Sequence, residues 1–193
     1  MRSSAHILGY HGCDREVGER ILNGGGHLLP SENDYDWLGS GIYFWEDNPG
    51  RALDWAQFVN KNPKYSRAKI NAPFVIGAII DPGNCLDLLQ SDSIRIVGES
   101  YERFADLFRA ADLPMPKNQR KGNEWAIRRL DCAVINHVHQ SRAQIGLTAF
   151  DTVRAAFEEG EPLYPTAGFH HRTHIQLCVR DTAQIVGYFR PIE

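Results

Sequence analysis

The chain has 193 residues, of which 42% are hydrophobic, and a formal net charge of −3. A chain of this length can bury roughly two-thirds of its unfolded surface, which fits one domain of ordinary size. A charge balance so close to neutral argues against a general affinity for nucleic-acid backbones or anionic membranes. We therefore expect a single domain over residues 1–193 that has no membrane partner.

The cysteines and the start of the chain bear on the cellular compartment. Four cysteines are scattered without any C-x-x-C pair, a spacing that suits neither a zinc site nor a small disulfide framework. We expect reduced thiols. The first residues contain no apolar signal segment, and no run is long enough to cross a bilayer. The expected location is cytoplasmic, or outside the cell after export by a route that cleaves no signal peptide.

Short elements follow one another in the first half of the chain. Residues 6–12 are apolar-rich and closed by a glycine, which is typical of a strand, and His11 lies at its end. Residues 16–22 are predicted to be a helix, since Asn23 and the three glycines after it favour a helix stop. The other elements expected here are a strand over 41–45, a helix over 51–59 and a central strand over 73–80.

Two amphipathic helices are predicted in the middle of the chain, over 101–111 and 124–139. The first is expected to end at Pro114 and Pro116, because neither proline can continue a helix. Both helices look like an insertion on a sheet scaffold. The remaining strands are expected over 150–157, 173–179 and 185–189.

The strand expected over 173–179 has two chemically different faces. Its apolar residues alternate with polar ones, so His174 and Gln176 lie together on the face opposite the apolar side chains. An imidazole and an amide on one strand face are compatible with a half-open cleft. A solvated sheet surface would give the same pattern.

Three motifs in this order resemble the NAD-binding core of the ADP-ribosyltransferases. They are Tyr10-His11-Gly12, the stretch LGSGIYF from Leu38 to Phe44, and the stretch QLCVRDTAQI over 176–185. The second and third are similar to segments of the poly(ADP-ribose) polymerase and diphtheria-toxin branch, whose signature is a His-Tyr-Glu triad. The resemblance covers roughly residues 6–59 and 170–190, and it puts Gln176 in the position of the glutamate.

The resemblance implies an α+β domain with a split, mostly antiparallel sheet, flanking and inserted helices, and an NAD cleft between the halves of the sheet. It implies that His11 hydrogen-bonds the adenosine ribose and that the Gly12 backbone pairs with the nicotinamide amide. Tyr43 would stack on the nicotinamide ring, with Gly41 and Cys13 also at the NAD site. Stacking of this kind contributes about 0.5–1.5 kcal/mol.

Gln176 is the main departure from the family pattern. It can bind a hydroxyl of the nicotinamide ribose, but it lacks the charge that would stabilise a developing cation. A unit charge at 4 Å and an effective dielectric of 20 contributes roughly 4 kcal/mol, about a thousandfold in rate. His174, two residues earlier on the same face, is expected to take a proton from the incoming nucleophile and partly replace the carboxylate. We thus expect Gln176, His174 and Tyr43 to be the catalytic residues.

The function implied is transfer of one ADP-ribose from NAD to a macromolecular acceptor, with release of nicotinamide. The acceptor, protein or nucleic acid, is not decided by the sequence. A bacterial toxin or effector with an inhibitor or antitoxin partner fits so compact a domain. Three alternatives stay open: a non-catalytic module that binds NAD or ADP-ribose, an NAD glycohydrolase, and an RNA 2′-phosphotransferase of the same superfamily.

Several single residues have simpler interpretations. Cys13 could be a thiol nucleophile, but a buried thiol is the default. Glu46 could supply the missing carboxylate, although a surface acid is the more common role for such a residue. Histidines at 137, 139, 170, 171 and 174 suggest a zinc site, yet no acidic residue or cysteine stands among them at a ligand spacing. Two basic loops, near Lys64 and Arg120, are usually solvated surface, and gripping a phosphate-rich acceptor is the alternative.

Overall fold

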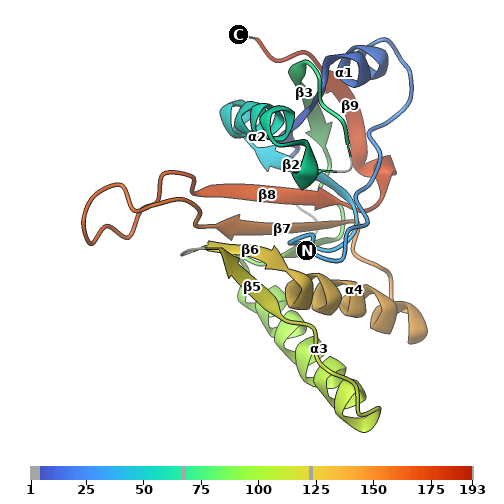
Figure 1. Ribbon diagram of the computed structural model, residues 1–193. Coiled ribbons are helices and arrows are strands. Elements are labelled where there is room, and N and C mark those ends of the chain that lie inside the picture. The colour runs from blue at the N-terminus through green and yellow to red at the C-terminus, as the bar shows by residue number, and fades with distance from the viewer. Residues whose placement is uncertain (1–4, 67, 122–123, 193) are drawn as a thin grey trace.

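A computed structural model of the chain describes residues 5–66, 68–121 and 124–192. It is an α+β structure built on a seven-stranded sheet with the strand order β4-β7-β8-β2-β1-β3-β9 (Figure 1). The strands are β1 (Ile7–Asp14), β2 (Ile42–Glu46), β3 (Pro73–Ile80), β4 (Cys85–Asp87), β7 (Thr152–Phe157), β8 (His174–Val179) and β9 (Ile185–Phe189). Neighbours pair antiparallel, except that β4 and β7 are parallel.

The sheet is divided near its middle. Strand β1 pairs with β3 over its whole length, from Ile7 to Asp14, but it pairs with β2 only through Gly9 and Tyr10. Beyond Tyr10 the two strands separate. The halves β9-β3-β1 and β2-β8-β7-β4 are therefore joined by a two-residue ladder, which gives a mostly antiparallel sheet with a partial split.

Helices α1 (Arg15–Leu22) and α2 (Pro49–Lys61) cover opposite faces of the β1–β3 half. A Cβ atom on Gly12 would lie 2.1 Å from the carbonyl oxygen of Ala52 in α2, so α2 packs directly on this strand residue. The next residue, Cys13, faces the other way, and its sulfur lies near Gly18 of α1. Because successive residues of β1 face opposite sides of the sheet, α2 and α1 pack on opposite faces of this strand.

The segment between β4 and β7 forms the insertion that the sequence predicts, although its parts differ from the prediction. It contains α3 (Ser91–Ala110), the hairpin of β5 (Asn118–Lys121) and β6 (Glu124–Arg128), and α4 (Arg129–Gln144). In Figure 1 the two helices lie side by side at one end of the molecule, and the pair is in contact. The prediction of a helix starting at 101 was wrong at that boundary, since α3 begins at Ser91.

The helix predicted over 124–139 was also wrong at its start. Residues Glu124–Arg128 pair with β5 as strand β6, and α4 begins only at Arg129. The reason is tertiary, because the side-chain oxygen of Asn118 accepts hydrogen bonds from the backbone N–H groups of Leu130 (2.9 Å) and Asp131 (3.2 Å). This distant asparagine caps the free amides of the first turn.

Each face of the sheet has its own hydrophobic core. One core, on the side of α1, includes Phe44, Ile76 and Leu177. The other is on the side of α4 and includes Val153 and Cys178 of the sheet with helix residues of α4. Because Cys178 and Leu177 are neighbours on β8, the strand contributes alternate side chains to the two cores.

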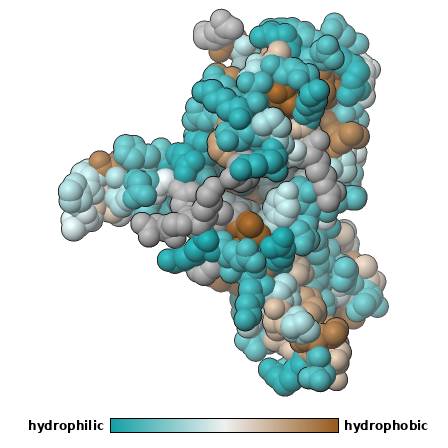
Figure 2. Space-filling view, in the orientation of Figure 1, coloured by the Kyte–Doolittle hydropathy of each residue, from teal (hydrophilic) through white to brown (hydrophobic). Residues whose placement is uncertain are grey.

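The surface is mostly hydrophilic on the face shown in Figure 2, with separate hydrophobic patches. Some of the exposed apolar residues lie on α3, such as Ile94 (56% exposed) and Leu107 (58%). The loop between β7 and β8, residues 158–173, extends away from the sheet (Figure 1). None of the described helices combines the length and the apolar character that spanning a bilayer requires.

Candidate functional site

Gln176 lies in the centre of the sheet, on the face that carries α2 and α4. It pairs with Trp45 on β2 and with Ala155 on β7, and Trp45 in turn pairs with Tyr10 on β1. Residues directly opposite one another in antiparallel strands project to the same face. These side chains therefore form one row, which we call the central row, and Tyr43 lies on the same face two residues from Trp45.

His11 lies where β1 and β2 separate. If the β1–β2 ladder continued, its next hydrogen-bonded pair would be Gly12 and Tyr43. Instead, the Tyr43 carbonyl oxygen accepts a hydrogen bond of 2.7 Å from Nδ1 of His11. A carbonyl only accepts, so Nδ1 carries the proton and Nε2 is the acceptor in neutral imidazole. Burial lowers the pKa of His11 and outweighs that hydrogen bond, which raises it. The imidazole is therefore neutral at physiological pH, with a defined tautomer.

The Gly12 backbone points into the gap between the strands. The Leu8 carbonyl accepts a hydrogen bond of 2.9 Å from the Asp47 N–H, which places it on the β2 side of β1. Both backbone groups of a strand residue point to one side, and alternate residues point to the same side. The N–H and C=O of Gly12 consequently face the gap. A donor and an acceptor on one residue are complementary to a primary amide.

Tyr43 is tied into the fold by its hydroxyl. The phenol donates a hydrogen bond of 2.7 Å to the Gly39 carbonyl and accepts one of 2.8 Å from the Leu38 N–H. Its ring packs against the core on the α4 side. Burial raises the pKa of Tyr43 well above its ordinary value, so it stays protonated. The structure gives Tyr43 the role of anchoring the preceding loop, and a stacking role remains a proposal.

Gly41 and Cys13 have packing roles. A Cβ atom on Gly41 would lie 2.5 Å from the sulfur of Cys178, so glycine permits the close approach of β8. The Cys13 side chain lies in the core on the α1 side and is 6% exposed, which confirms a buried thiol. Burial raises the pKa of Cys13 to about 11. A neutral, buried thiol is not an activated nucleophile.

His174 lies on the same face as Gln176 and is 6% exposed. Its Nδ1 donates a hydrogen bond of 2.7 Å to the Arg172 carbonyl, so its acceptor is Nε2. That Nε2 atom is buried and has no hydrogen-bond partner. Burial is also the main cause that lowers the pKa of His174. The ring is a neutral base whose lone pair is enclosed, next to the rings of Trp45 and Phe157 at centroid distances of 6.4 and 5.7 Å.

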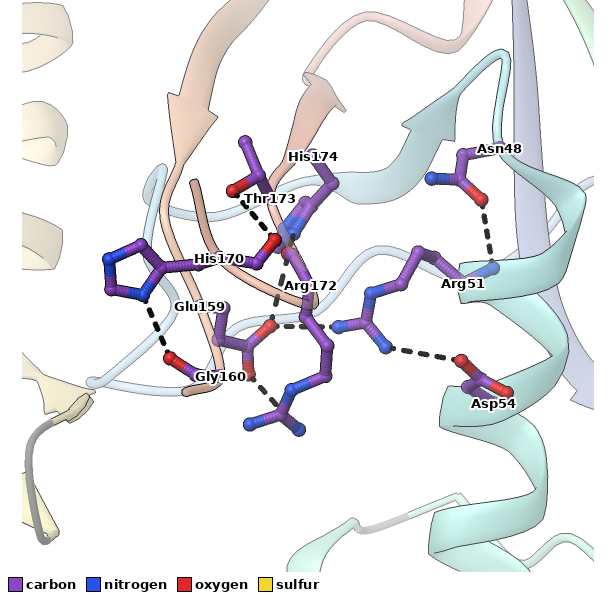
Figure 3. Close-up of polar contacts among 9 residues, drawn as sticks. All are labelled: Asn48, Arg51, Asp54, Glu159, Gly160, His170, Arg172, Thr173 and His174. Carbon is purple, nitrogen blue, oxygen red and sulfur yellow. Dashed lines mark hydrogen bonds and ion pairs between the residues drawn. The ribbon is translucent and has the colours of Figure 1, made fainter. Parts of the chain in front are cut away.

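A half-buried ion pair beside His174 was not predicted from the sequence (Figure 3). Arg51 of α2 donates a hydrogen bond of 2.7 Å to Glu159 at the start of loop 158–173, and the side chains are 14% and 18% exposed. The Glu159 carboxylate lies 3.9 Å from Nδ1 of His174 and 3.8 Å from the Arg172 guanidinium. The two partners are 108 residues apart, so no local motif could signal the contact.

An open pocket of about 450 Å³ lies where β2 ends and β8 begins. Its lining includes His174 and Thr173 of the β8 end and Asn48 at the start of α2. Asn48 caps α2 by accepting a hydrogen bond of 3.1 Å from the Arg51 N–H. The pocket adjoins the buried imidazole, but neither Arg51 nor Glu159 lines it. Glu46, Ala156 and Ile175, which project to the face opposite the central row, are also part of its lining.

Glu46 is on the wrong face to replace the missing carboxylate. It follows Trp45 on β2, so its side chain projects away from the central row. There it accepts two hydrogen bonds from Arg154, at 2.6 and 2.7 Å, and Arg154 also contacts Asp87 at 3.1 Å. Glu46 is consequently a member of a half-buried ion network rather than a free surface acid.

The histidines considered for a zinc site are spread over different elements. His137 and His139 lie on α4, whereas His174 lies on β8. Within the described ranges, no three side chains of metal-binding type come together. Of the two basic loops, the one near Lys64 includes Arg67, which lies outside the described residues.

The chain is similar to the uncharacterized protein MJ0359 of Methanocaldococcus jannaschii. The two are 27% identical over 202 aligned positions, which cover 96% of this chain and 87% of that protein. No protein-family model and no solved structure matches the chain. Because the name of this relative states no activity, function has to be inferred from the side chains.

Proposed function

We propose that the chain is an NAD-dependent mono-ADP-ribosyltransferase. The observation that carries the proposal is the hydrogen bond between the His11 imidazole and the Tyr43 carbonyl, at the point where the sheet divides. It fixes the tautomer of the imidazole, so that Nε2 is an acceptor, beside the paired donor and acceptor of the Gly12 backbone. Because His11 alternates with Tyr10 on β1, its ring lies on the face opposite the central row, near Phe44. Gln176 lies on β8, which is separated from β1 by β2 in the sheet. A ribose hydroxyl and a nicotinamide amide are complementary to these groups.

In the reaction, an acceptor nucleophile forms a bond to C1′ of the nicotinamide ribose while the bond from C1′ to the pyridinium nitrogen breaks. Nicotinamide leaves with that electron pair, and the nucleophile loses a proton to a base or to water. The chain's contribution is to bind and orient the dinucleotide, through His11, Gly12 and Gln176. Gln176 offers a dipole to the ribose but no negative charge, so we expect slow turnover.

His174 is the candidate base for the nucleophile's proton. Its Nε2 is deprotonated at physiological pH, as general-base catalysis requires. That atom is buried and has no hydrogen-bond partner. An acceptor group can reach it only if loop 158–173 or α2 moves, so acceptor binding and base access are coupled in this proposal.

Release of nicotinamide tests the function directly. The protein would be incubated with NAD labelled in the adenine moiety, alone and with a cell lysate. We expect lysate to increase nicotinamide release and to yield a labelled macromolecule, while His11→Asn and Gln176→Ala abolish both. Digestion of the product with protease or nuclease then identifies the acceptor class. Absence of labelling and of release by the folded protein would exclude the transferase.

A non-catalytic NAD-binding module is the second candidate. Two observations favour it: the amide at position 176 has no charge, and the Tyr43 hydroxyl already donates one hydrogen bond and accepts another within the fold. It predicts saturable NAD binding that depends on His11, with no nicotinamide release under any condition. An NAD glycohydrolase would instead release nicotinamide at the same rate with and without lysate.

A further inference from the structure

Three buried polar atoms without partners gather beside Gln176. Among the described residues, Nε1 of Trp45, Nε of Arg51 and Nε2 of His174 are buried and make no hydrogen bond. The Trp45 and His174 rings are 6.4 Å apart, and Arg51 and His174 both approach Glu159. Buried polar groups in native proteins normally have partners, including ordered water and ligands. The donors of Trp45 and Arg51 match oxygen atoms of a ligand, whereas the acceptor of His174 matches a hydroxyl group or a water molecule.

The charges around Glu159 favour an anionic ligand. Arg51 and Arg172 both contact its carboxylate, at 2.7 and 3.8 Å, and the charge of Glu159 also acts on the guanidinium of Arg128. Asp54 is the other acid here, 3.7 Å from Arg51, and its side chain is 66% exposed. Two arginines thus contact one half-buried carboxylate, and Arg128, which pairs with Asp131 at 3.6 Å, adds positive charge from further away. If that carboxylate were displaced, Arg51 and Arg172 would present their donors to whatever anion replaced it (Figure 3).

We propose that Arg51 is the centre of a phosphate-binding site, which Glu159 occupies as an internal anion until the ligand displaces it. A guanidinium binds a carboxylate and a phosphate through the same forked geometry, so one can take the place of the other. Arg51 is also the third residue of α2, whose first turn contains no acidic side chain, and the positive end of the helix dipole adds to the field. The choice of a nucleotide as ligand rests on the proposed function.

The position of the site suits a phosphate joined to a ribose at Gln176. His174 is two residues from Gln176 along β8, which is about 7 Å at the rise of a strand. The phosphate can come from the dinucleotide or from a phosphate-bearing acceptor. Both sources have the same chemistry, and a ligand series separates them.

Two substitutions that change phosphate affinity in opposite directions distinguish this site from a structural ion pair. A structural pair stabilises the fold, and loss of either partner leaves the other charge half-buried and unpaired. Phosphate binding would then weaken or stay the same in both variants. In a site where Glu159 competes with the ligand, Glu159→Gln removes the competitor and Arg51→Gln removes the binding group, so affinity changes in opposite directions.

The test is calorimetric titration of the full chain and its variants with inorganic diphosphate, nicotinamide riboside, nicotinamide mononucleotide and NAD. We expect Glu159→Gln to tighten diphosphate binding by about tenfold, and Arg51→Gln to weaken it by at least as much. Arg51→Lys, which keeps the charge without the fork, should be intermediate. Asp54→Asn is the matched control, because it removes an exposed acid beside the same arginine and should have a small effect.

The ligand series identifies the source of the phosphate. If Arg51→Gln weakens the mononucleotide and NAD but not the riboside, the phosphate belongs to the dinucleotide. If it weakens diphosphate alone, the phosphate belongs to the acceptor. In either case the site stands. Weaker or unchanged diphosphate binding in Glu159→Gln, in a variant that keeps its circular dichroism spectrum, would overturn it.

This result is separable from that of the proposed function. Diphosphate binding with the expected signs, but without binding of NAD or the riboside, would keep the phosphate site and exclude the transferase. Conversely, NAD turnover in a protein whose diphosphate affinity is the same in wild type and Arg51→Gln would keep the transferase and exclude the site.

Discussion

The Nδ1 atom of His11 lies 2.7 Å from the carbonyl oxygen of Tyr43, a group that the next ladder pair between β1 and β2 would otherwise have used. The imidazole thus substitutes for a backbone partner and stabilises the division of the sheet. A strand edge without such a substitute would leave polar groups unpaired, which is costly inside a protein. The residue expected to bind the ligand is therefore also part of the structure that opens the gap.

Replacement of His11 separates these two roles. In His11→Asn the side-chain amide N–H can still donate to the Tyr43 carbonyl, but the acceptor Nε2 is lost, and the amide oxygen of the shorter side chain does not take its position. In His11→Ala both are lost, and the buried carbonyl is left unpaired, at a cost of about 1–3 kcal/mol. We expect only His11→Ala to lower the free energy of unfolding in urea, and both variants to lose NAD affinity in a titration. NAD binding by His11→Asn at the wild-type affinity would contradict the role of Nε2.

A carboxylate at position 176 should accelerate nicotinamide release. Gln176→Glu nearly conserves the shape of the side chain and adds the charge that stabilises a developing cation, up to about a thousandfold if the full 4 kcal/mol is realised. Steady-state release of nicotinamide at saturating NAD measures it, with Gln176→Ala as the control that removes the amide. A slower Gln176→Glu enzyme with unchanged NAD affinity would show that charge at this position does not limit the rate.

Some elements could be predicted to the residue because their signals are local. Strands Pro73–Ile80 and Ile185–Phe189 have the bounds expected from their apolar runs and the turns beside them. The start of α4 could not, since its first turn is capped by Asn118 across the hairpin. Strand β6 was missed for the same reason, because its pairing with β5 outweighs the helical spacing of its apolar residues.

The candidate site, like the fold, could be predicted from the sequence only in part. The shared face of His174 and Gln176 follows from the two-residue period of a strand, which a sequence displays directly. The contact between Arg51 and Glu159 depends on how α2 and loop 158–173 come together, and neither residue stands in a recognisable motif. The resemblance implies that the Gly12 backbone pairs with the nicotinamide amide, which stays a prediction, whereas the close packing of α2 on Gly12 could not be read from the sequence.

A methyl group at position 12 should destabilise the fold. In Gly12→Ala the new Cβ would lie 2.1 Å from the backbone carbonyl oxygen of Ala52, an atom that cannot move without shifting α2. Overpacking of this kind costs about 1–3 kcal/mol. Urea unfolding measures the loss. The matched control is Gly187→Ala on β9, where a Cβ would meet no atom within 4 Å, and whose stability should stay close to that of the wild type.

The position-12 variant also tests the site. If α2 shifts to accommodate the methyl group, Arg51 and the gap move relative to each other, and NAD affinity should fall further than the loss of stability explains. Binding measured well below the unfolding transition separates the two effects. An unchanged affinity would mean that α2 relaxes away from the ligand.

His139 should make the stability of the fold depend on pH. It is 7% exposed on α4, neither ring nitrogen has a hydrogen-bond partner, and its pKa is lowered to about 3, mainly by burial and then by the charges of Arg180 and Arg142. The unfolded chain, with a pKa near 6.5, binds the proton first as pH falls. This contribution to stability is therefore complete above about pH 6.5 and is lost as pH drops toward the folded-state pKa.

The size of the effect follows from the interval between the two pKa values. Between pH 7 and pH 5 the wild type should lose about 2 kcal/mol more than His139→Leu, which carries no titratable group at this position. Other histidines whose pKa is lowered, such as His174, act alike in both proteins and cancel in the comparison. Urea unfolding at pH 7, 6 and 5 measures the difference. Parallel stability curves for the two proteins would show that His139 is not buried in its neutral form.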